Sequence, residues 1–302
     1  MSHSHHHHHS HISGKNLFWT IVLNVAITVA QAIGGFVSGS LALLSDAVHN
    51  LSDVLSLIIS YVANWLTRNK EQTLSQTFGY KRAEIVAAFF NAATLIVIAV
   101  ILSVEAIKRL KNPQEITGNL VIILALIAII ANGLGVLLVK KDAENNLNMK
   151  SAYLHLLTDM LTSVAVLIGG LLMKFFGMFW VDPVLTLIIS IYLIYMSWRI
   201  FIDSLKILML FAPDHIVMQD IEEEVIKIEG VKNIHHVHIW QLNDRDIHFE
   251  AHIEFANDIV LSDFDNKCEE IEQVLFKKFS INHTNLQPEY QRNDDKRFII
   301  QD

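Results

Sequence analysis

The sequence has few of the residues that support a soluble or disulfide-stabilised protein. It contains one cysteine among 302 residues, which excludes a disulfide framework and any zinc site built from several cysteines. Only 18% of the residues are charged, whereas a soluble chain has about a quarter, so an ordinary soluble enzyme is a poor candidate. Glycine and proline are also scarce and 52% of the residues are apolar, which excludes an intrinsically disordered chain.

Several motifs with well-understood chemistry are also missing. The sequence has no HExxH, which argues against a zincin-type protease, and no GxxxxGK followed by Ser or Thr, so it has no P-loop for ATP. The acidic C-terminal part lacks the basic surface that binding to nucleic acid requires, so we expect no nucleic-acid partner.

Charge is distributed unevenly along the chain. Residues 1–211 carry a net charge of +3 and residues 212–302 carry −11, which together give the formal charge of −8. The first part contains long runs without Asp, Glu, Lys or Arg, at Asn16–Ser45, Ile85–Val104 and Leu120–Val139. Because a helix of about 20 apolar residues crosses the hydrocarbon core of a bilayer, these runs predict membrane spans rather than buried core helices.

The hydropathy pattern predicts six membrane-spanning helices. Their expected ranges are 16–37, 41–67, 82–109, 118–140, 151–176 and 181–205. The segment before the first span, the loop between spans 2 and 3 and the loop between spans 4 and 5 all lie on one side of the predicted membrane domain. This side carries more Lys and Arg than the other side. Since positive charge favours the cytoplasmic side, we expect a multi-pass protein of the lipid bilayer with both termini in the cytoplasm.

The acidic C-terminal part is interpreted as a separate α+β domain. The expected elements are a helix at Gln219–Ile228, strands at Ile234–Leu242 and Ile247–Phe255, a helix from Ser262 to Lys278, and a strand at His283–Tyr290. Ser262 is expected to be the N-cap of the second helix. The order αββαβ predicts a small antiparallel sheet with helices on one face.

The predicted domain organisation therefore has three parts: a disordered tail at 1–14, a membrane domain at 15–211 and a cytoplasmic domain at 212–302. The tail is rich in Ser and His and has too few apolar residues to fold. It is either an expression tag or a native segment that binds zinc or copper weakly, and its irregular SHSHHHHHSH pattern leaves both interpretations open.

The same His–Asp spacing occurs in two of the predicted spans. His49 and Asp53 lie four residues apart within SDAVHNLSD, and His155 and Asp159 have the same spacing within SAYLHLLTD. Residues four apart share one face of a helix, so each helix presents an imidazole beside a carboxylate. Two such helices facing each other would supply two nitrogens and two oxygens, a tetrahedral set that suits Zn²⁺ and is usable by Co²⁺ or Cd²⁺.

The energetic cost of these residues supports a functional role. An ionised carboxylate at the centre of a membrane helix costs roughly 2.5–3.5 kcal/mol by insertion scales, so such residues are rare. The alternative is that each His–Asp pair is a local ion pair, but its repetition in two spans favours a shared metal site. Asp46 is either a hydrogen-bonding partner of a liganding imidazole or an acid placed at a helix N-terminus.

Histidines are also concentrated in the C-terminal part, at His235, His236, His238, His248, His252 and His283. His248 and His252 lie on the same face of their predicted strand, because alternate residues share a face. In a strand-rich acidic domain this pattern indicates peripheral metal sites. Solvated surface histidines are the alternative for some of them, His238 and His215 in particular.

These motifs resemble those of the cation diffusion facilitator transporters. The resemblance rests on the paired HxxxD motifs of the second and fifth spans, on FGYKRAE at 78–84 and on HTNLQPE at 283–289. It covers residues 12–291 and is strongest to the bacterial zinc, cadmium and cobalt resistance type with a His-rich N-terminus.

The resemblance implies a homodimer in the bacterial inner membrane, a ferredoxin-like cytoplasmic domain and zinc efflux driven by proton antiport. It assigns four side chains to the transport site: His49, Asp53, His155 and Asp159. In the cytoplasmic domain it assigns a second metal site, for regulatory zinc, to His235, His252, Asp265, His283 and Glu289. A histidine at position 49 matches the zinc-preferring pattern of the family.

The sequence departs from the family pattern at two places, and both affect the metal sites that we expect. The loop TRNKEQTLSQT between the second and third spans has no His or Asp, so we expect the additional loop site of some relatives to be absent. Position 285 is Asn where some relatives have an acidic ligand, so the cytoplasmic domain is expected to bind a smaller metal cluster or one that is shared differently.

Ligand chemistry predicts how transport would occur. Zinc binds neutral imidazole and ionised carboxylate, so zinc and protons compete for the same site. A site that opens alternately to either side would exchange outward Zn²⁺ for inward H⁺. We expect a secondary transporter rather than an enzyme, because four inward ligands leave no open coordination position. The alternative is a membrane-anchored zinc sensor or binding protein without transport.

Overall fold

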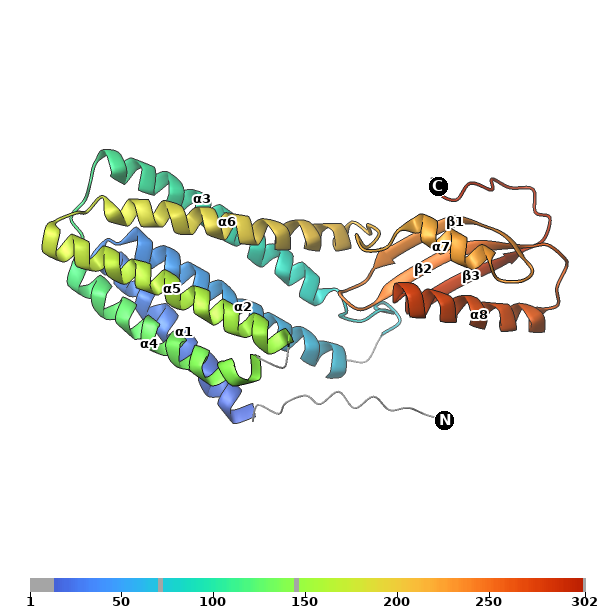
Figure 1. Cartoon of the computed structure of the whole chain (residues 1–302), viewed down its shortest axis with the longest axis horizontal. Helices are drawn as coiled ribbons and strands as arrows, with labels where there is room; N and C mark the ends of the chain where they lie inside the picture. The colour runs from blue at the N-terminus through green and yellow to red at the C-terminus, as the bar shows by residue number, and fades with distance from the viewer. Residues whose placement is uncertain (1–13, 70–72, 144–146, 301–302) are drawn as a thin grey trace. The chain divides into compact units, whose positions relative to one another are not determined.

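A computed structural model describes residues 14–69, 73–143 and 147–300, and the predicted disordered tail lies outside them except for Gly14. Within these residues, six long helices precede a smaller part that contains both helices and strands (Figure 1). The six helices are α1 (Gly14–Ser38), α2 (Leu41–Asn69), α3 (Ala83–Lys111), α4 (Gly118–Ala143), α5 (Leu147–Phe176) and α6 (Val181–Leu208). Their bounds agree with the predicted ranges to within a few residues.

Most of the six helices have the length and composition of membrane spans. On the described residues, four of them are long and apolar enough to cross a bilayer: Ala83–Lys111, Gly118–Leu137, Tyr153–Phe176 and Val181–Leu208. A shorter apolar stretch lies in α1 at Asn24–Ser38. The chain is a multi-pass integral membrane protein, and the predicted fold class is confirmed.

The chain forms two compact units. One unit comprises the residues up to Ile59 together with Asn91–Arg199. In this unit α4 packs closely along α5, and glycine makes the approach possible: a Cβ on Gly118 would lie 3.1 Å from the Gly170 carbonyl oxygen. Small residues of this kind let the backbones of membrane helices come together.

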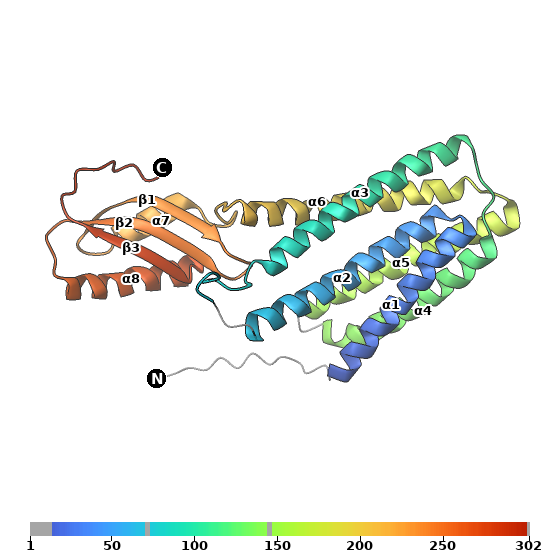
Figure 2. The same ribbon diagram turned by 180° about the vertical axis from the view of Figure 1, so that it is seen from behind.

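The other unit comprises Ser60–Phe90 and the chain from Ile200 onward. It contains α7 (Met218–Ile226), β1 (Val231–Gln241), β2 (Ile247–Phe255), α8 (Leu261–Phe279) and β3 (His283–Glu289). The strands form one sheet in the order β1-β2-β3, and α7 and α8 cover the same face of it, as the views from the two sides show (Figure 1, Figure 2). The predicted αββαβ order is confirmed.

The core of this domain lies between the sheet and the helices. Phe249, Ala251, Ile253 and Phe255 on alternate positions of β2 are buried. They pack in one cluster with side chains of both helices, which include Ile221 and Leu275. The opposite face of the sheet carries polar side chains, so it is this face that is available for metal ligands.

Two details of the predicted domain are wrong. β2 pairs with β1 antiparallel but with β3 parallel, so the sheet is mixed rather than antiparallel. The reason is the connection: α8 carries the chain back along the sheet, and such a helical crossover makes parallel neighbours. Ser262 is not an N-cap, because α8 begins at Leu261 and the carbonyl of Val260 already accepts hydrogen bonds from the amides of Asp263 and Phe264.

Candidate metal centres

The first candidate site lies between α2 and α5. α2 carries His49 and Asp53, and α5 carries His155 and Asp159. Within each helix the two side chains are one turn apart and on the same face, as the i,i+4 spacing dictates. The structure brings the two pairs together.

The four side chains form a closed ring of contacts. His49 Nε2 lies 3.2 Å from Asp159 Oδ1 and 3.7 Å from Asp53 Oδ2. His155 Nε2 lies 3.4 Å from Asp53 Oδ2 and 3.6 Å from Asp159 Oδ2. For a tetrahedral zinc with bonds near 2.0–2.1 Å, neighbouring ligand atoms are about 3.3 Å apart. The four contacts are thus close to this spacing, and His49 and His155 meet different oxygens of Asp159.

The ligands differ in their positions within the ring. One ligand atom from each of His49, Asp53 and Asp159 lies within 4.8 Å of the other two. His155 is the outermost member: its side chain is 48% exposed, compared with 7% for Asp159. The ring centroids of the two histidines are 6.0 Å apart, and His155 is not part of the group whose ligand atoms lie within 4.8 Å of one another.

A buried hydrogen-bond network lies next to this site. Asp46 on α2 accepts hydrogen bonds from Gln31 Nε2 of α1 at 2.7 Å and from Ser163 Oγ of α5 at 3.4 Å. Asn50 donates to the Gln31 side-chain oxygen at 3.0 Å. Asp46 is fully buried and links three helices, so it is not an exposed acid at a helix end.

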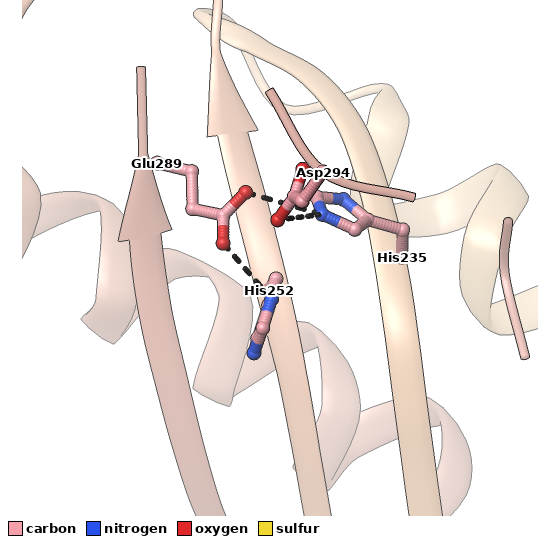
Figure 3. Close-up of side chains that lie close together, drawn as sticks. All are labelled: His235, His252, Glu289 and Asp294. Atoms are coloured by element: carbon pink, nitrogen blue, oxygen red, sulfur yellow. Dashed lines mark ion pairs between the residues drawn. The ribbon is translucent and has the colours of Figure 1, made fainter. Parts of the chain in front are cut away.

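The second candidate site lies on the polar face of the three-stranded sheet. His235 of β1, His252 of β2, Glu289 at the end of β3 and Asp294 of the following segment point toward one another (Figure 3). His235 Nε2 is 3.1 Å from Glu289 Oε2 and 3.7 Å from Asp294 Oδ2, and His252 Nδ1 is 2.9 Å from Glu289 Oε1. One ligand atom from each of the four lies within 4.8 Å of the others.

Sequence reasoning and structure differ on the membership of this cluster. His235, His252 and Glu289 were expected in it and are there. His283 lies elsewhere, paired in register with His248 at the opposite end of β3, and Asp265 is on α8, which covers the other face. Asp294 was not expected, because it lies in an irregular segment in which no periodicity predicts the direction of a side chain.

Two cationic side chains already contact this cluster. Lys296 Nζ donates to Glu289 Oε2 at 2.8 Å, and Arg292 Nη1 donates to Glu289 Oε1 at 3.2 Å. Burial alone would raise the pKa of Glu289, but the hydrogen bonds from Lys296 and Gln287 lower it below its usual value. Burial lowers the pKa of His252, and so do the neighbouring His236 and His235, although the charge of Glu289 acts in the opposite direction. The lowered pKa favours the neutral imidazole that metals bind.

His248 and His283 form a separate pair. Their ring centroids are 4.3 Å apart, and the Trp240 ring stacks on His248 at 5.4 Å. The Phe78 ring meets His248 edge-on at 5.5 Å. Among the described residues no third ligand group joins these two imidazoles, and the rings form a contact between the loop before α3 and the sheet.

Comparison with known families identifies the fold that carries these sites. Residues 17–209 match the family model described as the cation efflux transmembrane domain, and residues 213–291 match that of the cation efflux protein, cytoplasmic domain (ZT_dimer). The chain belongs to the cation efflux family. Its resemblance to the cation diffusion facilitators is thereby confirmed.

Relatives within the cation efflux family cover nearly the whole chain. The cadmium, cobalt and zinc/H(+)-K(+) antiporter of Bacillus subtilis is 35% identical over 295 residues, which are 96% of this chain and 94% of the relative. The zinc transporter ZitB of Escherichia coli is 32% identical over 297 residues, 96% of this chain and 93% of the relative. The metal cation efflux system protein CzcD of Cupriavidus metallidurans is 32% identical over 273 residues, 90% and 85% of the two chains.

Proposed function

We propose that this protein exports zinc from the cytoplasm by exchanging Zn²⁺ for H⁺ at a tetrahedral site. The ligands are His49 and Asp53 of α2 and His155 and Asp159 of α5. The closed ring of contacts among these four side chains, with spacings of 3.2–3.7 Å, is the observation that carries the proposal. Two imidazoles and two carboxylates are a donor set that zinc prefers.

Proton coupling follows from the same donors. Zinc binds only the neutral imidazole and the ionised carboxylate, so protons that reach the site displace zinc and zinc displaces protons. Histidine has an unperturbed pKa near 6.5 and therefore exchanges its proton in the physiological range. A site reached alternately from the two sides of the membrane then converts a proton gradient into zinc efflux without an enzymatic step.

The names of the relatives support the choice of metal. Two of the similar proteins are named for zinc, and the Bacillus subtilis relative is also named for cadmium and cobalt. All three ions accept a tetrahedral set of nitrogen and oxygen ligands. Zinc is therefore the proposed main substrate, and Cd²⁺ and Co²⁺ are further ions that the same site would accept.

The cytoplasmic domain is proposed to bind regulatory zinc. His235, His252 and Glu289 supply ligands, while the geometry favours Asp294 over His283 and Asp265 as the remaining one. The match to the ZT_dimer family model supports a homodimer. We further propose that the tail at 1–14, the membrane domain at 15–211 and the domain at 212–302 are the functional parts, with both termini in the cytoplasm of a bacterium and the spans in its inner membrane.

A membrane-anchored zinc sensor is the second candidate function. It is favoured by one observation: the cytoplasmic cluster brings four ligand groups together without any contribution from the membrane helices. Such a sensor would bind zinc saturably but would not accumulate it in vesicles. Efflux accounts for both ligand sets and is therefore the preferred function.

A zinc flux assay in proteoliposomes with an imposed pH gradient separates the two functions. With an acidic lumen, the full chain should accumulate zinc in the lumen and make the lumen more alkaline as protons leave. His49→Ala and Asp159→Ala should abolish both signals. Ser103→Ala is the matched control, because the Ser103 hydroxyl donates to the carbonyl of Ala99 in its own helix and is not part of the ring of four contacts.

The outcomes are distinct. Zinc binding without luminal accumulation would support the sensor and reject efflux. Normal flux in both site variants would reject the α2–α5 site. Flux that does not change the luminal pH would reject proton coupling while leaving efflux in place.

A further inference from the structure

The segment after β3 returns to the sheet and is held on β1. We call residues 292–298 the C-terminal strap. The backbone amide of His236 donates to the carbonyl of Arg297 at 3.2 Å, and the amide of Val237 donates to the carbonyl of Phe298 at 2.9 Å. The Phe298 side chain packs against the core of the domain. The strap is therefore an ordered part of the sheet edge.

The register of β1 explains why the strap fits at this position. The pairing of β1 with β2 shifts between His235 and His238, and His236 has a positive φ of 52°. Such a bulge leaves residues of one strand without partners in the ladder. At this bulge the carbonyl groups of Arg297 and Phe298 in the strap accept hydrogen bonds from the amides of His236 and Val237.

Lys296 of the strap reaches the centre of the candidate metal cluster. Its ammonium Nζ lies 2.8 Å from Glu289 Oε2 and 3.3 Å from His235 Nε2, and it also pairs with Asp294. Three of the four ligand groups thus contact one positive charge. Burial opposes the charge on Lys296, but hydrogen bonds to Asp294 and Glu289 outweigh it and raise the pKa of its ammonium.

We propose that the Lys296 ammonium is a built-in competitor for zinc, which zinc must displace to bind His235, His252, Glu289 and Asp294. This inference rests on the cytoplasmic zinc site proposed above. The strap then supplies both the competing cation and, through Asp294, one of the ligands. The apparent zinc affinity of the domain is consequently set by the strap as well as by the strands.

The physical argument is a competition for lone pairs. Glu289 is 5% exposed, and a buried carboxylate needs a cationic partner. Without zinc, Lys296 and Arg292 are the cationic partners of Glu289, and with zinc the metal takes the place of Lys296. Lysine suits the role because its ammonium is a compact charge on a flexible stem, which can leave the site while the strap backbone stays on β1.

Hydrogen exchange on the full-length protein in detergent provides a local readout. The amides of His236 and Val237 lie beside the His235 ligand and bond to the strap, so their exchange rates during a zinc titration report on this site and not on the membrane site. Lys296→Met should lower the zinc concentration at the midpoint by about tenfold, and Asp294→Asn should raise it by about tenfold, the scale on which groups around a metal site change its affinity. Without zinc, Lys296→Met should also speed exchange of both amides.

Two further variants separate the effect of charge from loss of packing. Lys296→Arg retains the charge and should keep a midpoint near that of the wild type. Lys277→Met is the matched control, because Lys277 is on α8 and contacts Gln273 rather than the cluster.

The possible outcomes bear on different claims. An unchanged midpoint in Lys296→Met, with zinc still altering exchange, would overturn the competition but leave the zinc site in place. An unchanged midpoint in Asp294→Asn would remove Asp294 as a ligand. No effect of zinc on these amides in any variant would reject the cytoplasmic zinc site and the inference together.

Discussion

The Nε2 atom of His49 lies 3.2 Å from Oδ1 of Asp159, which joins α2 to α5 across 110 residues of sequence. The other oxygen of Asp159 faces His155 at 3.6 Å, so one buried carboxylate contacts both imidazoles. Asp53 contacts the same two imidazoles from α2. The side chains proposed to bind the cargo are thus also the polar contacts between the two helices at this level.

Asp159→Asn should separate zinc binding from folding. A ligand present at 100 times its dissociation constant stabilises a protein by about 2.7 kcal/mol, and removing an anionic ligand should abolish that gain at this site. Without zinc, Asp159→Asn removes the charged partner of two imidazoles, so the melting temperature should be unchanged or lower. The measurement is thermal unfolding in detergent with and without zinc, in chains that also carry Glu289→Gln so that the cytoplasmic cluster does not contribute.

The result that contradicts this prediction is equally clear. If Asp159→Asn retains the full zinc-dependent rise in melting temperature, Asp159 is not a ligand of the membrane site. Asp46→Asn is a useful comparison, because Asp46 lies in the neighbouring hydrogen-bond network and not in the ring of four contacts.

The membrane helices, and the placing of each His–Asp pair on one face of its helix, could be predicted from the sequence. Charge-free runs and i,i+4 spacing depend only on the order of neighbouring residues along the chain. The juxtaposition of His49 with His155 needed a second assumption, that two similar amphipathic faces bury their polar groups against each other. The i,i+4 spacing places each pair on one face, and the cost of an ionised carboxylate in lipid favours turning those faces inward.

The cytoplasmic cluster was less predictable. Alternation along β2 placed His252 on the polar face, but the parallel pairing of β3 depends on the crossover through α8, which has no local signature. This pairing sets His283 opposite His248 and Glu289 opposite Glu254. Asp294 follows the last strand, and its position depends on the strap binding to β1, which only tertiary structure reveals.

We expect Asp182 to stabilise the N-terminus of α2. It is fully buried and accepts hydrogen bonds from Ser40 Oγ at 2.5 Å and from the amides of Leu41 and Ala42 at 2.9 and 3.3 Å. A carboxylate at a helix N-terminus satisfies amides that have no partner within the helix and interacts favourably with the helix dipole. Asp182→Asn should therefore lower the stability of the folded chain by about 1–2 kcal/mol.

Thr186→Val is the control for this substitution. The Thr186 hydroxyl donates to the carbonyl of Asp182, which lies in the same helix, so its loss should be nearly neutral. Thermal unfolding in detergent measures both variants. Equal melting temperatures for Asp182→Asn and the wild type would show that the cap contributes nothing.

Lys81 and Asp246 should stabilise the contact between the loop before α3 and the turn after β1. Their side chains are 2.7 Å apart and 34% and 26% exposed. Burial alone would raise the pKa of Asp246, but the hydrogen bond and charge of Lys81 lower it. Because both groups are partly exposed, a double-mutant cycle with Lys81→Met and Asp246→Asn should give a coupling of about 0.2–1 kcal/mol near pH 7.

The pH dependence of this coupling has a definite sign. A lowered pKa in the folded state means that the stabilisation is complete above the unfolded Asp pKa of about 3.9 and disappears as the pH falls through the lower folded value. The coupling should also weaken in high salt. A coupling that persists at pH 2 would mean that packing, rather than charge, joins the two residues.

His248 should make the cytoplasmic domain sensitive to mild acid. Burial, then the neighbouring charges of His283 and Lys81, lower the pKa of His248 below its usual 6.5, while Asp246 opposes them. The unfolded chain therefore binds this proton at a higher pH than the folded chain does. Stability that is complete above about pH 6.5 must fall as the pH decreases from there toward the lower folded pKa.

Histidine NMR titration of the full chain between pH 7.5 and 5 measures the pKa of His248. Urea unfolding over the same pH range measures the change in stability. His283→Gln removes one charge that disfavours protonation, so the pKa of His248 should rise toward 6.5 and the loss of stability in acid should become smaller. His215→Gln is the control, since His215 lies in the exposed segment before α7. If His283→Gln leaves the His248 titration unchanged, burial and the charge of Lys81 account for the lowered pKa, and the pair of rings 4.3 Å apart has no electrostatic role.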